Sequence, residues 1–591
     1  MPVTDRVRRA AVLLIPALLV MAGLFARQMG AGALRAFIHY QTPFALPPAP
    51  ARPGPPLSRQ VVVVLVDGLG LAGAQGLPFL GELRARGADY DCHIGEPSLS
   101  LPGRAVMLSG AWQEVNGQPT NYDPRPLRVE HAFTVARRQG LATALAAGAN
   151  GLRLFAPALS RPVVHPDDAV SAPFAAYEAA QRRQAEAGRA LLGELRGQPA
   201  LVMIELHAVD ESGHGWGGAS DEYRRAAAEA DDAVRSFAST LDLDRDTLVV
   251  TADHGHVGIG GHGGPEEEVL HVPLVLAGAG IRAGARGAAR QVDIAPTLST
   301  LLGLAIPSSN QGRPLLDALA LDPPRRAEAL QAVLAQREQF VAGYVRMLAS
   351  LHGGAAVGAE TTGAAPAAPA DEVGALARLD ALDAREARTK WEWRARERRA
   401  RVRPALFLVL APLALGTALA GLGIVRGGET RRAILAAAAG LALYHLALPV
   451  LGLRYSLTAV NKDEWLPAFF RKDMALGLGA CAFAVAAGAW RERRRHGARL
   501  FDLTRYAWLV TAAFCFAFVV KVAVVYWAQG AMSRWMIANM RWGFAFYLDI
   551  LVLMAVGVLS PLMVLPAWLA AWRSPPALPA PEAAALARGV L

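Results

Sequence analysis

Three short, mainly apolar runs in the first half of the chain have the pattern of buried strands. They cover residues 60–66, 201–206 and 247–251, and Val, Leu and Ile dominate them. Continuous apolar runs of this length are typical of central strands in a parallel sheet, because helices cover both of its faces. The pattern therefore predicts an α/β domain with a mostly parallel sheet sandwiched by helices.

Six longer apolar segments approach the length of about 20 residues that a helix needs to cross a bilayer. They cover residues 10–26, 405–425, 434–453, 474–490, 506–527 and 546–572. Hydrophobic residues make up 53% of the chain and charged residues 19%, a balance too apolar for a soluble enzyme of this size. We therefore expect an α-helical transmembrane domain with one N-terminal span and about five C-terminal spans.

The first apolar segment has two interpretations. It follows three arginines, as the apolar part of a cleaved signal peptide would. Its length favours an uncleaved membrane anchor.

These patterns divide the chain into six parts. We expect an anchor at 1–30, a Pro-rich linker at 31–58, the α/β domain at 59–320, a helical and Gly/Ala/Pro-rich connector at 321–403, the multi-span domain at 404–572 and a tail at 573–591. Within the connector, apolar spacing predicts a helix over 325–351, and the composition of 353–371 predicts a flexible linker.

The distribution of arginine and lysine predicts the orientation in the membrane. These residues are more frequent at the amino terminus and after the second and fourth predicted spans than in the other short loops. The positive-inside rule makes those regions cytoplasmic and puts residues 28–403 on the other side. A basic run at 388–403 opposes this assignment, but long exported segments follow the rule poorly. That run either contacts anionic lipid headgroups or is a solvated helix surface.

Carboxylates and imidazoles follow directly after the three predicted strands. Asp67 follows the first, Asp210 and His214 the second, and Asp253 and His254 the third. They should converge, because ligand crevices of such sheets lie outside the carboxyl ends of the strands. Carboxylate oxygen and imidazole nitrogen suit zinc or manganese, and a pair of such ions clamps the two reacting oxygens in a displacement at phosphorus. The sequence therefore predicts a two-metal phosphoryl-transfer site.

Ser100 is the candidate nucleophile of this site, with Ser98 as the alternative in the same segment. Pro102 marks a helix start, whose free N–H groups and dipole favour a bound phosphate. Arg104 follows in the same helix and either contacts phosphate in a bidentate manner or is exposed. An exposed arginine is the simpler interpretation.

Together these residues resemble the alkaline phosphatase superfamily, and within it the type I phosphodiesterase/nucleotide pyrophosphatases and the GPI ethanolamine-phosphate transferases. The resemblance covers roughly residues 59–316 and implies an alkaline-phosphatase-like sheet. It assigns one ion to Asp210, His214 and His262, and the other to Asp67, Asp253, His254 and the nucleophile Ser100.

Further residues take their expected roles from the same resemblance. In these relatives the second hydroxyl of the segment reacts, which favours Ser100 over Ser98. His262 lies in a glycine-rich segment like that of the relatives, and His271 is its competitor. Asn121 falls where the phosphodiesterases hold a non-bridging phosphate oxygen. Arg104 is a departure, because the pattern has histidine there.

The resemblance and the predicted spans lead to a functional hypothesis. We expect two divalent ions, Zn²⁺ or alternatively Mn²⁺, and a membrane-bound enzyme that transfers a phosphoethanolamine-type group through a phosphoryl-serine intermediate. The donor would be a lipid and the acceptor a lipid or glycan. We expect membrane lipid as a partner and no nucleic acid. The oligomeric state is left open.

Other classes stay as alternatives. A phosphodiesterase or nucleotide pyrophosphatase would use water as the acceptor, and a membrane scaffold would not be catalytic. A sulfatase is disfavoured on the interpretation that the Cys/Ser-x-Pro-x-Arg signature of that branch is missing around Ser100.

Three ionisable residues fall within the predicted spans, where charges are costly: His445, Lys521 and Asp549. They either line a polar groove that admits a lipid headgroup, or Lys521 and Asp549 pair and lock two helices together.

Overall fold

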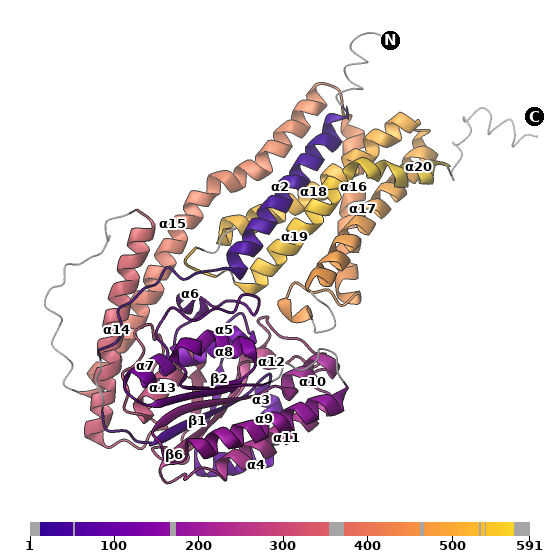
Figure 1. Cartoon of the computed structure of the whole chain (residues 1–591). Coiled ribbons are helices and arrows are strands. Elements are labelled where there is room, and N and C mark those ends of the chain that lie inside the picture. The colour runs from indigo at the N-terminus through magenta and orange to yellow at the C-terminus, as the bar shows by residue number, and fades with distance from the viewer. Residues whose placement is uncertain are drawn as a thin grey trace, which may run out of the picture.

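The computed structural model describes residues 12–50, 54–165, 173–353, 371–460, 466–530, 534–537 and 539–572 (Figure 1). The expected linker lies outside the described residues over 354–370, as do the tail at 573–591 and the arginines at the amino terminus. An α/β domain lies at one end of the molecule and a bundle of long helices at the other.

Among the described residues, eight strands form one sheet in the order β4-β3-β5-β1-β6-β7-β2-β8. They are β1 (Gln60–Val66), β2 (Ala88–His93), β3 (Ala142–Ala147), β4 (Arg161–Val164), β5 (Ala200–Leu206), β6 (Asp246–Thr251), β7 (His271–Gly278) and β8 (Arg286–Arg290). Strand β1 lies between β5 and β6 and is parallel to both, whereas β7 runs antiparallel to its two neighbours. Every residue of β1, β5 and β6 is buried, as their apolar runs predict.

Helices cover both faces of this sheet (Figure 1). One layer contains α3 (Leu71–Ala74), α4 (Pro78–Arg86), α9 (Phe174–Glu194), α10 (Ala208–Trp216) and α11 (Asp221–Ala238). The other contains α5 (Ser100–Ser109), α7 (Ala132–Arg138), α8 (Ala149–Phe155) and α13 (Ile294–Leu301). Shorter helical turns are η1 (Ala156–Ala158), η2 (Gln291–Asp293), α6 (Gln113–Asn116) and α12 (Glu267–Leu270). This arrangement is the predicted mostly parallel sheet between helices.

The helix predicted over 325–351 is α14 (Pro323–Leu351), which packs against the long helix α15 (Glu372–Gly421). Its apolar residues, including Val333, Phe340 and Tyr344, join the core of the α/β domain. The chain therefore leaves the α/β domain through a helical pair.

In the described part of the chain, six helices are long and apolar enough to cross a membrane. They are α2 (Leu14–Ile38), α15, α16 (Gly427–Val450), α17 (Leu466–His496), α18 (Leu500–Gln529) and α19 (Met540–Val558). The expected fold class, an α/β domain with one amino-terminal span and five later ones, is confirmed.

Some boundaries differ from those predicted. The segment 546–572 is not one span, because α19 ends at Val558 and the turn η4 (Ser560–Met563) precedes a short helix, α20 (Val564–Trp572). Pro561 lies in that turn, and proline removes a backbone donor and clashes with the preceding helical turn. The segment 405–425 is mostly the end of the 50-residue helix α15, which also contains the basic run.

The amino-terminal helix α2 packs closely against α19. A Cβ atom on Gly23 would lie 2.7 Å from the backbone nitrogen of Val558, and a Cβ atom on Gly557 would lie 3.0 Å from the Cα atom of Gly23. Small residues permit such close backbone contact between spans. The first span is therefore part of the helix bundle.

The ionisable residues in the spans form a connected polar cluster. Lys521 on α18 pairs with Asp549 on α19, and its ammonium also donates to the Tyr455 hydroxyl at 3.1 Å. His445 lies within 3.4 Å of the same hydroxyl. Asp549 is buried. The contacts favour the interpretation in which Lys521 and Asp549 join two helices.

A loop between two spans docks on the α/β domain. The turn η3 (Leu457–Ala459) carries Thr458, whose hydroxyl accepts a hydrogen bond from Gly264 N–H at 2.9 Å and donates one to Glu266. Gly261 has a φ of +101°, and a Cβ there would lie 2.1 Å from the Thr458 carbonyl oxygen. Only glycine permits this approach. The bundle thus contacts the glycine-rich segment that contains His262.

The basic run on α15 also joins the two parts. Lys390 pairs with the buried Glu114 of the α/β domain, and Arg401 donates to the Trp527 carbonyl of α18 at 3.2 Å. Trp393 stacks on His352 at a centroid distance of 4.2 Å. These side chains contact protein, so the run is more than a solvated or lipid-facing helix surface.

Replacing Thr458 with valine should weaken the docking of the loop by about 1–3 kcal/mol, because it leaves the Gly264 N–H and the Glu266 carboxylate without this partner. Hydrogen exchange of residues 260–266 in detergent-solubilised protein measures the effect. Thr417→Val is the control, since the Thr417 hydroxyl donates to a carbonyl of its own helix and is exposed. Equal exchange in both variants and the wild type would contradict the docking role.

Candidate metal centre

The three parallel strands end at the same level. Val66 is paired with Leu206, and Leu65 with Thr251, so Asp67 lies beside the starts of the segments that follow β5 and β6. Gly68, with a φ of +76°, turns the chain here, and a Cβ on it would lie 2.7 Å from the Asp210 Cα atom. Asp210 and His214 are then presented one turn apart on α10.

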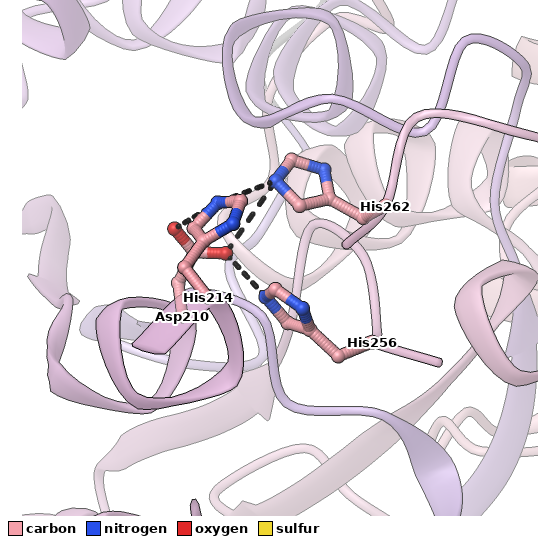
Figure 2. A group of neighbouring side chains, drawn as sticks. All are labelled: Asp210, His214, His256 and His262. Atoms are coloured by element: carbon pink, nitrogen blue, oxygen red, sulfur yellow. Dashed lines mark hydrogen bonds and ion pairs between the residues drawn. The ribbon is translucent and has the colours of Figure 1, made fainter. Parts of the chain in front are cut away.

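One group of possible metal ligands consists of Asp210, His214, His256 and His262 (Figure 2). The Nε2 atoms of His214 and His262 are 3.1 Å apart. Asp210 lies 3.5 Å from His214 and 3.6 Å from His262, measured between a carboxylate oxygen and Nε2. The structure thus brings the three residues expected for the first ion together.

A second group consists of Asp67, Asp253 and His254, all of them buried. His254 Nε2 lies 3.4 Å from an Asp67 oxygen and 3.9 Å from Asp210, so the two groups adjoin. Ser100, the first residue of α5, has its Oγ 3.2 Å from His254 Nε2. The residues expected for the second ion therefore lie together with the candidate nucleophile.

Hydrogen bonds distinguish the roles of the histidines. His262 Nδ1 faces the Ser98 carbonyl at 2.9 Å and His254 Nδ1 the Gly255 carbonyl at 3.3 Å. A carbonyl oxygen can only accept a hydrogen bond, so each Nδ1 carries the hydrogen and each Nε2 keeps its lone pair for a metal. This is the usual arrangement of a ligating histidine.

His256 has the opposite arrangement, and the sequence analysis missed this residue. Its Nδ1 accepts a hydrogen bond from Gly261 N–H at 3.1 Å, so Nε2 carries the proton and donates to Asp210 at 2.7 Å. Burial lowers the pKa of His256 to about 4, which keeps the ring neutral. His256 therefore orients Asp210 and has no free ring nitrogen with which to bind a metal. Its place two residues after His254 was the available signal.

The competitor of His262 lies elsewhere. His271 begins β7 and is bound by Asp91 at 2.7 Å and Glu267 at 3.0 Å. It is in neither of the two ligand groups found among the described residues.

The expectation that Arg104 is exposed is wrong. The side chain is buried and its guanidinium contacts Asp67 at 2.6 Å, Glu205 at 2.9 Å and Asp253 at 3.7 Å. The helix α5 crosses the strand ends, so a residue one turn after Ser100 points into the acidic cluster. The strand residue Glu205 is also part of this cluster and was not predicted.

The charge balance of the cluster fits cations. Asp67, Glu205, Asp210 and Asp253 are four buried or nearly buried carboxylates. Arg104 contacts three of them, and His207 lies 3.1 Å from Asp67 and 3.5 Å from Glu205. Burial opposes the charge on His207, but its hydrogen bond to Asp67 raises its pKa to about 8. Burial and the neighbouring Asp67 carboxylate raise the pKa of Asp253 well above its usual range. Burial opposes ionisation of Asp67 too, but Arg104 brings its pKa below the usual range.

Four carboxylate oxygens of the cluster are buried and accept no hydrogen bond from a described residue. They are Asp67 Oδ1, Asp253 Oδ2 and both oxygens of Glu205. A buried carboxylate oxygen that accepts no hydrogen bond is costly, and divalent cations would satisfy those of Asp67 and Asp253 in the second ligand group. The residues present therefore fit the metal pair that the sequence predicts.

Asn121 and Ser98 support the nucleophile segment. Asn121 Oδ1 accepts the Leu101 N–H at 2.9 Å, which leaves the amide NH₂ to donate to a ligand beside Ser100. Ser98 Oγ donates to the Gly264 carbonyl at 2.8 Å and accepts from Gly263 N–H at 3.0 Å. Ser98 thus fastens the glycine-rich segment, and its hydroxyl is occupied.

Residues 61–265 match the family model of the type I phosphodiesterase / nucleotide pyrophosphatases. The expected resemblance to the type I phosphodiesterase/nucleotide pyrophosphatases is thereby confirmed, and similarity to GPI ethanolamine phosphate transferases is found as well. GPI ethanolamine phosphate transferase 1 of Homo sapiens is 22% identical over 313 residues, which cover 44% of this chain and 33% of that protein. GPI ethanolamine phosphate transferase 2, catalytic subunit, of Homo sapiens is 23% identical over 290 residues, 46% of this chain and 29% of that protein. The chain spans about a third of the length of these curated relatives.

Solved structures with partial similarity include the alkaline phosphatase PafA, at 12% identity and a TM-score of 0.38, covering 47% of this chain and 100% of that one. The 2-O GAG sulfatase BT1596 has 17% identity and a TM-score of 0.37, covering 47% of this chain and 74% of that one. Scores this low support no argument about function.

The reason for which the sequence analysis disfavours a sulfatase is wrong. Ser100, Pro102 and Arg104 do have the Ser-x-Pro-x-Arg spacing, and Arg104 contacts the acidic cluster. The signature is therefore present, and sulfate esters return as candidate substrates.

Replacing Arg104 with methionine should lower the free energy of unfolding by about 3–5 kcal/mol in the presence of a chelator, because buried carboxylates lose their cation. Added Zn²⁺ should recover part of the loss by neutralising the same charges. Denaturant unfolding with and without EDTA measures both effects. Arg196→Met, at an exposed position, is the control and should change little; an equally mild effect of the Arg104 substitution would contradict its role.

His256 and His262, both drawn in Figure 2, carry their proton on different ring nitrogens. Replacing each of them should therefore change the metal content differently. His262→Gln should lose one ion per chain, whereas His256→Gln should keep both and bind the ion at Asp210 about 10–100-fold more weakly. Metal analysis of purified protein and titration with a competing chelator separate these results. Loss of one ion from the His256 variant alone would reverse the assignment.

Proposed function

We propose that this protein is a membrane-bound, two-metal phosphoryl-transfer enzyme that acts through a phosphoryl-serine intermediate. It transfers a phosphoethanolamine-type group from a lipid donor to a lipid or glycan acceptor. The observation that carries the proposal is the position of Ser100 Oγ, 3.2 Å from His254 Nε2, in a domain joined to six candidate spans.

The residues have distinct roles in this proposal. Asp210, His214 and His262 would hold one ion, and Asp67, Asp253 and His254 the other, with Ser100 beside it. Divalent ions at such a site lower the pKa of a hydroxyl nucleophile and neutralise charge on phosphate and leaving oxygens. Carboxylates with imidazoles favour Zn²⁺, with Mn²⁺ as the alternative. The Asn121 amide would hold a non-bridging phosphate oxygen.

The reaction has two displacements at phosphorus. In the first, Ser100 Oγ bonds to phosphorus, the bond from phosphorus to the glycerol oxygen breaks, and that oxygen takes up a proton as diacylglycerol leaves. In the second, an acceptor hydroxyl bonds to phosphorus, the Oγ–phosphorus bond breaks, and Ser100 recovers its proton. Arg104 contacts Asp67 and Asp253 and so orients their carboxylates throughout.

The architecture supports a lipid substrate. Six candidate spans and the docked η3 loop hold the strand ends of the α/β domain next to the helix bundle. The two human relatives named above are GPI ethanolamine phosphate transferases. The charge pattern of the loops supports a non-cytoplasmic, periplasmic or lumenal, location of the catalytic domain.

Two alternatives share the same groups. Water as the acceptor would make the protein a phosphodiesterase, which the matched family model favours over residues 61–265. Sulfate ester hydrolysis is favoured by Arg104 in its Ser-x-Pro-x-Arg context.

Detergent-purified protein incubated with headgroup-labelled phosphatidylethanolamine should transfer label to a glycolipid acceptor, and Ser100→Ala should abolish transfer because the attacking oxygen is lost. The variant should keep both ions, since three protein ligands remain at each. Thin-layer chromatography of the products and metal analysis measure the two effects. Ser239→Ala is the control and should retain transfer, because Ser239 is exposed and its hydroxyl donates only to the Ser236 carbonyl.

The products separate the alternatives. Headgroup release without an acceptor would identify a phosphodiesterase, and turnover of an aryl sulfate in place of the lipid would identify a sulfatase. Full transfer by Ser100→Ala would exclude the serine mechanism.

A further inference from the structure

An apolar pocket lies where the helix bundle meets the α/β domain. Its walls come from the domain-facing ends of four candidate spans, with Leu34 and Phe37 on α2, Phe470 on α17, and Phe544 on α19 among its lining residues. Its lining is largely hydrophobic and aromatic, and two parts of the molecule that are far apart in sequence build it. In Figure 1 the ends of α2 and α19 point toward α5 and α6.

The opposite wall belongs to the candidate active site. Leu99, the residue before Ser100, lines the pocket, and so do Thr120 and Tyr122 on either side of Asn121. The hydrogen bond from Leu101 N–H to Asn121 Oδ1 ties these two segments together beside the nucleophile. The apolar pocket therefore reaches the backbone that carries Ser100.

The pocket also touches the other half of the metal centre. Leu457 of η3 lines it and packs beside Gly263, where an added Cβ would lie 3.0 Å from the Leu457 side chain. Gly263 follows His262. A ligand seated in the pocket would thus contact both segments that frame the space between the two ligand groups.

The chemistry of this surface selects its occupant. A nucleotide or sugar phosphate has no alkyl chain to bury here, whereas each methylene of such a chain moved from water into the pocket strengthens binding about fourfold. One buried acceptor in the lining, Gln529 Oε1, receives no hydrogen bond from a described residue and can accept one from a ligand donor.

We propose that this pocket binds an acyl chain of a diacyl glycerophospholipid and so holds the phosphodiester of that lipid at Ser100. This rests on the proposed function and names the part of the donor that the enzyme recognises. The chain fixes the lipid along α2 and α19, and the headgroup end reaches the space between Asn121 and the metal ligands. The pocket then recognises the acyl chain of the donor, whereas Ser100 and the metal ligands act on its phosphorus.

Leu34→Trp tests the pocket, with Leu24→Trp on the same helix as the matched control. Leu34 lines the pocket, whereas Leu24 is 48% exposed on the outer face of the bundle. In mixed micelles of dioleoyl phosphatidylethanolamine, Leu34→Trp should lower kcat/KM at least about tenfold, because the indole displaces two or more methylenes of the chain. Turnover of water-soluble bis(4-nitrophenyl) phosphate should stay unchanged in both variants.

The outcomes decide the proposal. Unchanged lipid turnover by Leu34→Trp would overturn it, and so would an equal fall on the lipid and on the soluble diester. Retained lipid turnover by Leu24→Trp with a selective fall in Leu34→Trp supports it.

A binding measurement separates failure of the pocket from failure of the proposed function. A phosphatidylethanolamine with a diazirine on its acyl chain should label peptides containing residues 33–38 or 540–547 in the wild type and in Leu24→Trp, and much less in Leu34→Trp. This result would support the pocket even for a protein inactive on the lipid. Labelling of other peptides in the wild type would overturn the proposal. This wild-type result decides the question even if Leu34→Trp does not fold.

Discussion

The arrangement of the site depends on the repulsion between carboxylates that three parallel strands deliver to one buried place. Asp67, Asp210 and Asp253 cannot all be charged there without a compensating cation, since burial penalises each charge and each raises the cost of the others. Arg104 on helix α5 and His207 supply part of the compensation, and divalent ions held by the two ligand groups would supply the rest. The fold therefore holds a structure that metal binding completes.

The need to bind cations among these carboxylates also explains the hydrogen bonds around the metal ligands. His256 donates to Asp210, and the carbonyls of Ser98 and Gly255 orient His262 and His254. Each contact fixes a proton on one ring nitrogen and so decides which nitrogen remains free. A site of this kind needs a rigid surround, and the glycine-rich segment gains it from Ser98 on one side and Thr458 of the bundle on the other.

The bundle is therefore more than an anchor. Through η3 and α15 it contacts the α/β domain at the segments that carry His262 and Glu114, and together they enclose an apolar pocket next to Ser100. An enzyme whose substrate lies in the membrane has to bring a polar phosphodiester to a polar site while its chains stay in an apolar one. The boundary between the two parts of this molecule offers both surroundings within a short distance.

The sequence by itself determined the strands at 60–66, 201–206 and 247–251, the six spans and the positions of the carboxylates and imidazoles, because burial on both sheet faces, membrane thickness and strand ends leave periodic or compositional signals. Tertiary structure decided the rest. Burial of Arg104, the orienting role of His256, the division of 546–572 into two helices and the pairing of Lys521 with Asp549 depend on which side chains meet across elements distant in sequence. A single residue carries no local signal of the partner it will face, so these contacts follow only from the packed fold.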